Sequence, residues 1–269
     1  MLIETLLQAF ILIFAIQVAF FILAYTLKTD KFTDFAYGAS FIITAFFVLI
    51  KTHQPLFSLP KIPLAKFLIL AMVTLWGVRL ATYLLIRILK TKKDKRFDKI
   101  REDFLKFAGF WFLQAISIWM ISLPVMVLLN VPPANNEVLQ PNILSILGFV
   151  VWLAGFLTEA IADQQKFEFL NKKANKGRWV NVGLWKYSRH PNYFGEILCW
   201  IGVFVFAMSF LGPDYFYIAA SPLYITALLL FVSGLPPAEK SMEEKFAGIP
   251  AYEQYKDETS VLVPLPKRG

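Results

Sequence analysis

The sequence contains a single cysteine. Cys199 is the one thiol among 269 residues, which excludes an internal disulfide and any metal site built from several cysteines. It lies within an apolar run, and that position favours a packed thiol over a nucleophile.

Charged residues are also scarce. They make up 17 % of the chain, whereas about 25 % is usual in soluble domains. Apolar residues reach 57 %, and the chain has 27 phenylalanines. A soluble fold cannot bury that much apolar surface, and the same composition argues against disorder. The sequence therefore predicts a polytopic membrane protein.

Seven stretches are long and apolar enough to cross a bilayer, which takes about 20 residues as a helix. They lack the alternating pattern of barrel strands, so we expect an all-α bundle of seven transmembrane helices. The expected spans are residues 5–27, 34–50, 64–88, 108–130, 142–163, 193–212 and 215–234.

The distribution of basic residues predicts the orientation of these helices. Of 27 lysines and arginines, 22 follow the first, third, fifth or seventh expected span. By the positive-inside rule, the N-terminus lies outside and the C-terminus is cytoplasmic. This topology explains the net charge of +8, so no nucleic-acid partner is expected. His53 and His190, the only histidines, then lie on opposite sides of the membrane, and we predict no metal site.

Ionisable side chains within the fifth and sixth spans indicate a functional cavity, because such groups are costly in lipid. Glu159 and Asp163 lie four residues apart and share one helix face, and Asn192 and Glu196 repeat that spacing. The two pairs could serve only to join helices. Their convergence beside a basic loop favours a ligand site instead.

A second set of polar positions lies in the N-terminal half. Asp34 opens the second span with Tyr37 close behind it, and a polar stripe follows the third span at Arg79, Tyr83 and Arg87. Arg79 is more than two turns inside its span and is expected to need a partner.

The loop before the sixth span has features of an anion site. Ser188 and Pro191 are typical of a helix start, where unpaired backbone N–H groups suit phosphate. Basic residues add charge and aromatic residues offer flat rings for stacking, namely Arg178, Lys186, Arg189, Trp179, Trp185 and Tyr187.

The segment Arg189-His190-Pro191-Asn192-Tyr193-Phe194-Gly195-Glu196 resembles the C-terminal signature of the steroid 5-alpha-reductase-like membrane proteins, specifically their bacterial DUF1295 branch. The resemblance extends to residues 34–38, 76–80, 233–236 and 252–264. It implies one membrane domain, residues 1–269, in a bacterial inner membrane, with a substrate half at about 1–130 and a cofactor half at about 142–269. The implied activity is NADPH-dependent reduction of an activated C=C bond in a lipid-like enone that enters from the bilayer.

The resemblance also implies which residues hold NADPH. Lys166 stands beside the basic position of the family, which is Phe167 here, and Lys240 lies near the position of a cofactor-binding histidine. Positions that match other cofactor contacts of the family are Glu159, Asp163, Arg178, Tyr187, Asn192 and Glu196. We include Trp185, Arg189, His190 and Tyr193 from the same segment.

The substrate end matches the family less closely. The steroid enzymes use a Gln-Glu pair on the second span and a tyrosine on the third. Asp34 is the nearest acid here, and Trp76 occupies the tyrosine position. A protonated Asp34 or a tyrosine hydroxyl would stabilise charge that develops on the substrate carbonyl. The predicted catalytic set is Asp34, Tyr37, Trp76, Arg79 and Tyr83.

Two other functions stay open. Integral-membrane methyltransferases of isoprenylcysteine or phospholipid have a similar Arg-His-Pro-x-Tyr-x-Gly segment and a tail like residues 243–255, and they bind S-adenosylmethionine. The intramembrane acids and Asn192 favour the reductase. A transporter is a third possibility, but no paired inverted repeat supports it.

Overall fold

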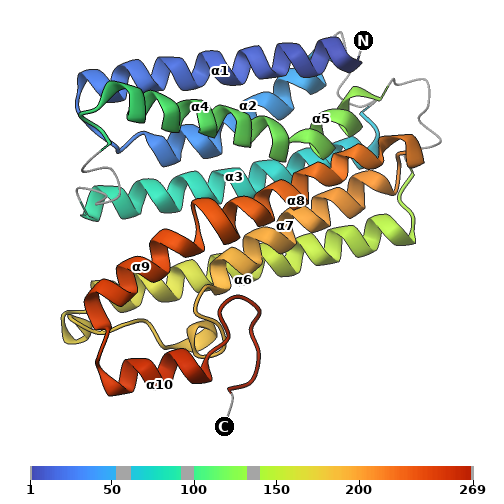
Figure 1. Ribbon diagram of the computed structural model, residues 1–269. Coiled ribbons are helices and arrows are strands. Elements are labelled where there is room, and N and C mark those ends of the chain that lie inside the picture. The colour runs from blue at the N-terminus through green and yellow to red at the C-terminus, as the bar shows by residue number, and fades with distance from the viewer. Residues whose placement is uncertain (1, 53–61, 92–99, 132–139, 268–269) are drawn as a thin grey trace. The chain divides into compact units, whose positions relative to one another are not determined.

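The computed structural model describes residues 2–52, 62–91, 100–131 and 140–267, so His53 lies outside the described part of the chain. The described chain is predominantly helical (Figure 1). Its helices are α1 (Leu2–Thr26), α2 (Thr33–Thr52), α3 (Leu64–Thr91), α4 (Phe104–Ile121), α5 (Leu123–Asn130), α6 (Ile143–Asn171), α7 (Pro191–Met208), α8 (Ala220–Ala227), α9 (Leu235–Phe246) and α10 (Pro250–Glu258). Over these residues no strand forms, and one isolated bridge joins Ser188 to Ser260.

The expected all-α membrane fold is confirmed. Seven helical stretches of the described chain are long and apolar enough to span a membrane. The orientation of the termini stays a prediction.

The chain folds into two compact units. The first comprises residues 1–147 and 203–221, and the second comprises residues 148–202 and 222–269. The division into a substrate half and a cofactor half stays a prediction, and residues 142–147 and 203–221 of the predicted cofactor half belong to the first unit.

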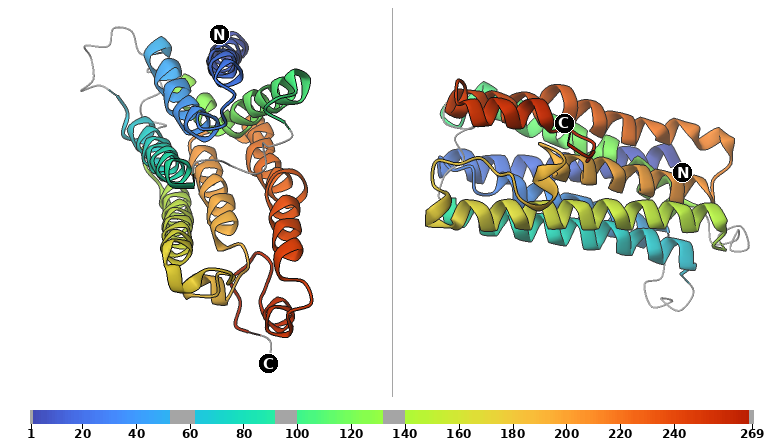
Figure 2. Two further views of the ribbon diagram at one scale, coloured as in Figure 1. Left: turned by 90° about the vertical axis from the view of Figure 1, so that its left-hand side faces the viewer. Right: turned by 90° about the horizontal axis from the view of Figure 1, so that it is seen from below.

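Buried amides join three helices of the first unit. The Gln17 side chain on α1 donates a hydrogen bond to Ser40 Oγ on α2 at 2.9 Å. The Gln114 amide on α4 donates to Gln17 Oε1 at 2.9 Å and to the Thr33 carbonyl at 3.1 Å. Hydrogen bonds of this kind hold helices together where lipid supplies no hydrophobic driving force. They fix α1, α2 and α4 side by side, as Figure 2 shows.

The helical segment at the expected span 108–130 has a break that the sequence analysis did not predict. Helix α4 ends at Ile121, and α5 begins at Leu123 after Ser122. Pro124 explains the division, because proline has no N–H to donate and its ring clashes with the carbonyl four residues earlier.

Helix α6 extends beyond its expected end at residue 163. It continues to Asn171 as one helix of 29 residues. The last turns of α6 carry polar residues. The sequence analysis placed these residues in a loop because it ended the helix where the apolar run ends.

The polar helix α9 follows a local change in helix type. Residues Leu228–Val232 form a π-helical turn, and the Ser233 N–H donates to the Leu228 carbonyl at 2.8 Å. At Gly234, a Cβ would lie 2.3 Å from the Leu229 carbonyl oxygen, so only glycine fits. Pro236 and Pro237 then start α9. The apolar span therefore ends at the π-helical turn, and the polar helix α9, which carries part of the candidate site, begins after it.

Candidate functional site

Glycines bring α6 and α7 into backbone contact within the second unit. A Cβ at Gly195 would lie 2.5 Å from the Glu159 nitrogen, and one at Gly155 would lie 2.5 Å from the Cys199 nitrogen. Small residues allow such close helix crossings in membranes. Cys199 is buried, and its thiol faces the Trp152 carbonyl at 3.7 Å. Cys199 is thus part of the packing of this crossing.

The crossing gathers the polar pairs that the sequence predicted to converge. Glu159 and Asp163 are buried on α6, and the Asn192 amide on α7 donates to Asp163 Oδ1 at 3.3 Å. Gly195 lies between Asn192 and Glu196 on α7 and against Glu159. The two i,i+4 pairs therefore meet at the cytoplasmic end that the sequence predicts for both helices.

One buried polar atom of this cluster could accept a hydrogen bond from a ligand. Among the described residues, the buried Asn192 Oδ1 has no hydrogen-bond donor. A buried carbonyl oxygen without a donor costs about 1–3 kcal/mol, so such an atom indicates a missing partner. An amide or hydroxyl group of a bound cofactor would satisfy it.

The loop after α6 is anchored on the same helix. The Trp185 indole N–H donates to the Ala162 carbonyl at 2.9 Å, and Lys166 Nζ lies 5.0 Å from the centre of the Trp185 ring. Gln165 Oε1 accepts from the Leu184 N–H at 2.9 Å. Trp185 is 4 % exposed, and its ring lies against α6, where it contacts the Ala162 carbonyl and the ammonium group of Lys166.

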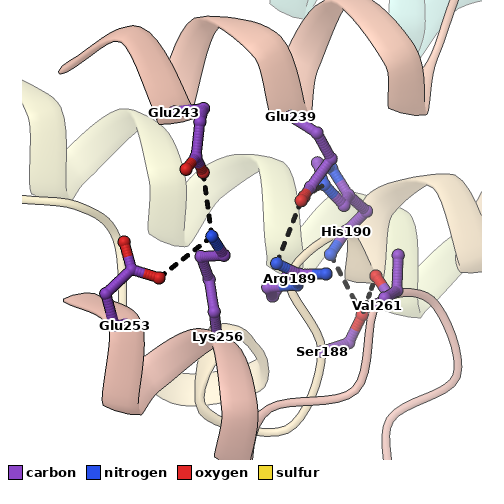
Figure 3. A network of polar contacts seen from close by, with 8 residues as sticks. All are labelled: Ser188, Arg189, His190, Glu239, Glu243, Glu253, Lys256 and Val261. Carbon is purple, nitrogen blue, oxygen red and sulfur yellow. Dashed lines mark hydrogen bonds and ion pairs between the residues drawn. The ribbon is translucent and has the colours of Figure 1, made fainter. Parts of the chain in front are cut away.

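Glu239 on α9 is the site residue that sequence reasoning missed (Figure 3). Its Oε1 lies 2.5 Å from His190 Nε2, and its Oε2 lies 2.9 Å from Arg189 Nη1. The His190 ring also stacks on Tyr193, with centroids 5.3 Å apart. Both carboxylate oxygens thus hold the segment that starts α7. No periodicity in the sequence links residue 239 to residue 190, so spacing alone could not find this contact.

Burial lowers the pKa of His190 below its ordinary value, and the neighbouring Glu239 carboxylate opposes that change. Desolvation disfavours the charged imidazolium, whereas a carboxylate partner favours it. The net direction leaves His190 predominantly neutral near pH 7, with Nε2 directed at Glu239.

The C-terminal tail fixes the loop from the other side. Ser188 Oγ accepts from the His190 N–H at 3.1 Å and donates to the Leu262 carbonyl at 2.7 Å. The Arg189 N–H donates to the Ser260 carbonyl at 2.8 Å. Ser188 thus joins the tail to the start of α7, where the sequence suggested a helix cap.

Aromatic residues of the tail pack as a small core. Trp179 forms edge contacts with Phe246 and Tyr252 at centroid distances of 5.7 Å and 5.3 Å. The Tyr255 hydroxyl donates to the Trp185 carbonyl at 2.9 Å. Burial raises the pKa of Tyr255 above its ordinary value, so its hydroxyl stays protonated in this contact.

The other predicted cofactor residues lie nearer the surface. Arg178, Tyr187 and Lys240 are exposed, and Lys240 follows Glu239 on α9. The structure therefore joins Asp163 to Asn192, Lys166 to Trp185, and Tyr193 to His190, and leaves these three residues open to solvent.

The predicted catalytic residues all lie in the first unit. Asp34 Oδ2 on α2 accepts a hydrogen bond from Arg87 Nη2 on α3 at 3.0 Å. Tyr37 contacts Phe41, and Phe41 contacts the buried Trp76, with centroids 5.0 Å and 5.2 Å apart. Arg87, which sequence reasoning left outside the catalytic set, is thus the observed ion-pair partner of Asp34.

Close contact between α2 and α3 places these side chains. A Cβ at Gly77 would lie 3.1 Å from the Gly38 carbonyl oxygen, and one at Gly38 would lie 3.0 Å from the Ala81 Cβ. Arg79 and Tyr83 follow on α3 at helical spacing toward Arg87. Within the described residues, no group of three or more histidine, cysteine or acidic side chains is arranged to hold a metal ion.

Comparison with known families assigns the chain. Residues 20–259 match the family described as "Protein of unknown function (DUF1295)". The chain belongs to the DUF1295 family. Comparisons with curated proteins and with solved structures gave no match. The family match includes parts of both units and every predicted site residue, and it confirms the DUF1295 part of the resemblance.

Proposed function

We propose that the protein is a membrane-embedded, NADPH-dependent reductase of an activated C=C bond in a lipid-like enone. The observation that carries the proposal is the α6–α7 crossing, where Asn192 contacts Asp163 at 3.3 Å and its buried amide oxygen has no donor in the described part of the chain. These are positions that resemble cofactor contacts of the steroid 5-alpha-reductase-like proteins.

Charge around the site favours an anionic cofactor. The loop between α6 and α7 and the tail carry exposed cations, among them Lys172, Lys173, Lys176 and Arg178. NADPH is a polyanion, whereas S-adenosylmethionine carries a net positive charge and has no phosphate. A cationic rim therefore attracts the first ligand and repels the second.

The tail does not favour the methyltransferase. Its shared aromatic residues Phe246, Tyr252 and Tyr255 pack with Trp179, and Glu243 pairs with Lys256 at 2.9 Å. These contacts give the tail a role in folding, which suits either activity.

NADPH, when bound, supplies the hydride for the reduction. In our proposal Asn192 Oδ1 accepts a hydrogen bond from the cofactor, and Glu239 holds His190 at the edge of the site. In the first unit, Asp34 already accepts a hydrogen bond from Arg87. We assign the hydrogen bond to the substrate carbonyl to Asp34 or to the hydroxyl of Tyr37 or Tyr83, which would stabilise developing enolate charge.

Calorimetric titration of purified protein with NADPH, and separately with S-adenosylmethionine, tests the proposal. Wild-type protein should bind NADPH, and Asn192→Ala should weaken binding by roughly 5- to 150-fold, because one buried hydrogen bond is worth about 1–3 kcal/mol. Asn171→Ala is the matched control: Asn171 is exposed on α6, and its amide bonds only the Phe167 carbonyl at 2.7 Å.

Two results would overturn the reductase. Binding of S-adenosylmethionine without NADPH would transfer the assignment to the methyltransferase. Failure to bind either ligand, in protein that melts cooperatively, would exclude both enzymes.

A further inference from the structure

The loop that follows α6 presents an ordered set of cations. Lys172, Lys173 and Lys176 are exposed, and they lie on and around the 3₁₀ turn Lys173–Asn175. Asn175 holds this turn, because its side-chain amide donates to the Phe169 carbonyl at 2.9 Å and its N–H donates to the Lys172 carbonyl at 3.0 Å. The positive charges are thus fixed at the end of α6 by contacts of a neutral residue.

These lysines have no acidic counterpart in the described part of the chain. None of the three forms an ion pair there. Glu168, one turn before the loop, is bonded to Gln164 at 2.6 Å. Glu168 keeps its negative charge in this contact, so residues 168–176 carry a net charge of +2 from three lysines and one glutamate.

The interior of the candidate site has the opposite character. Its acidic residues outnumber its basic ones. The basic residues are Lys166 and Arg189, and the acidic residues are Glu159, Asp163, Glu196 and Glu239. The formal charges of this group give an approaching anion no net attraction. An anionic ligand of this site needs a positive surface nearby that raises its local concentration.

The position of the loop favours a soluble ligand over a lipid headgroup. The apolar part of α6 ends at Ala162, and residues 163–171 continue the helix for about 13 Å at 1.5 Å per residue. The headgroup zone is only about 5–7 Å thick on each side of the hydrocarbon. An upright α6 therefore carries the lysines past the headgroups into water.

We propose that Lys172, Lys173 and Lys176 form a capture surface that steers a polyanionic nucleotide toward the α6–α7 site. The inference rests on the proposed function for the identity of the nucleotide. The lysines act on the rate of association and do not contact the ligand once it is bound. Electrostatic steering of this kind accelerates association by about 10- to 1,000-fold at low ionic strength, and salt removes it.

Stopped-flow binding of NADPH to protein in nanodiscs of neutral phosphatidylcholine tests this role. The variant replaces all three lysines by glutamine: Lys172→Gln, Lys173→Gln and Lys176→Gln. The control carries the same loss of charge at three exposed lysines elsewhere, Lys28→Gln, Lys31→Gln and Lys106→Gln.

In the loop variant we expect the association rate constant to fall about 10-fold at about 0.02 M salt, with the dissociation rate unchanged. The difference from wild type should close at about 0.5 M salt. The control should associate at nearly the wild-type rate.

Other results separate the possible failures. Wild-type protein that does not bind NADPH overturns both this inference and the proposed function. Wild-type binding with equal association rates in the two triple variants overturns only the capture surface. Unchanged association in the loop variant, together with loss of co-purified anionic phospholipid by native mass spectrometry, would also overturn it and would assign the lysines to the membrane surface.

Discussion

Glu239→Gln isolates the contact between α9 and the start of α7. The substitution keeps the size of the side chain and removes its charge, and the two contacts affected are those to His190 and Arg189 at 2.5 Å and 2.9 Å. Because the imidazole is buried, it has little access to solvent that could replace the carboxylate.

The expected effect is a further fall in the pKa of His190. The carboxylate is the group that raises this pKa against burial, and a hydrogen bond to a charged partner is worth about 1.5–3 kcal/mol. That energy corresponds to about one to two pKa units. The Nε2–H tautomer, which donates to Glu239, should also lose its preference.

The chain suits the measurement, because it has only two histidines. In a His53→Gln background, ¹⁵N-labelled imidazole gives the signals of His190 alone, and a pH titration reports both tautomer and pKa. Glu243→Gln is the matched control, since Glu243 lies one turn further along α9 and pairs with Lys256 at 2.9 Å.

Stability should follow the same linkage. The pKa of His190 is lower in the folded protein than in the unfolded chain, so the unfolded chain binds the proton more tightly. The contribution of His190 to stability is present above its ordinary pKa of about 6.5 and is lost as the pH falls below that value. In Glu239→Gln the loss of stability should continue to a lower pH than in wild type, because the pKa of His190 in the folded protein falls further. A His190 pKa and tautomer unchanged in Glu239→Gln, or changed equally in Glu243→Gln, would refute the assigned contact.

Two further predictions concern packing and topology. Gly195→Ala should lower the free energy of unfolding by about 1–3 kcal/mol, because its Cβ would lie 2.5 Å from the Glu159 nitrogen. Gly109→Ala places its Cβ in open space and should raise the free energy of unfolding by about 0.5–1 kcal/mol. Equal melting temperatures of the two variants would contradict the helix crossing. Cysteines introduced at the exposed Gln140 and Lys173 should react with an impermeant reagent from opposite sides of the membrane, while the native Cys199 stays buried; labelling from one side would reject the predicted orientation.

Sequence reasoning located the polar groups of α6 and α7 because local geometry controls their placement. Residues four apart on a helix share a face whatever the surroundings, so helical spacing alone is enough to recognise the pairs Glu159/Asp163 and Asn192/Glu196. Gly195 within the second pair is also typical of a close backbone approach.

Contacts between distant segments could not be predicted in this way. Lys66 lies near the start of the span expected at residues 64–88, where it is buried and donates to the Leu129 carbonyl at 2.9 Å and to the Val131 carbonyl at the end of α5. Those carbonyls are free because α5 ends at Asn130, and the last carbonyls of a helix have no partner within it. Apolar length predicted this helix end but not the side chain that satisfies it.

The sequence by itself determined the class of the protein, its seven membrane-spanning helices and the two polar faces of the candidate site. These features depend on apolar length and helical spacing, which are properties of short segments. Only the tertiary structure decided that Asp34 pairs with Arg87, 53 positions away, and that Glu239 pairs with His190, 49 positions away. The crossing of helices and the docking of loops determine such partners, because a partly buried charged side chain pairs with an opposite group that lies near it in space. The sequence does not show which group that is.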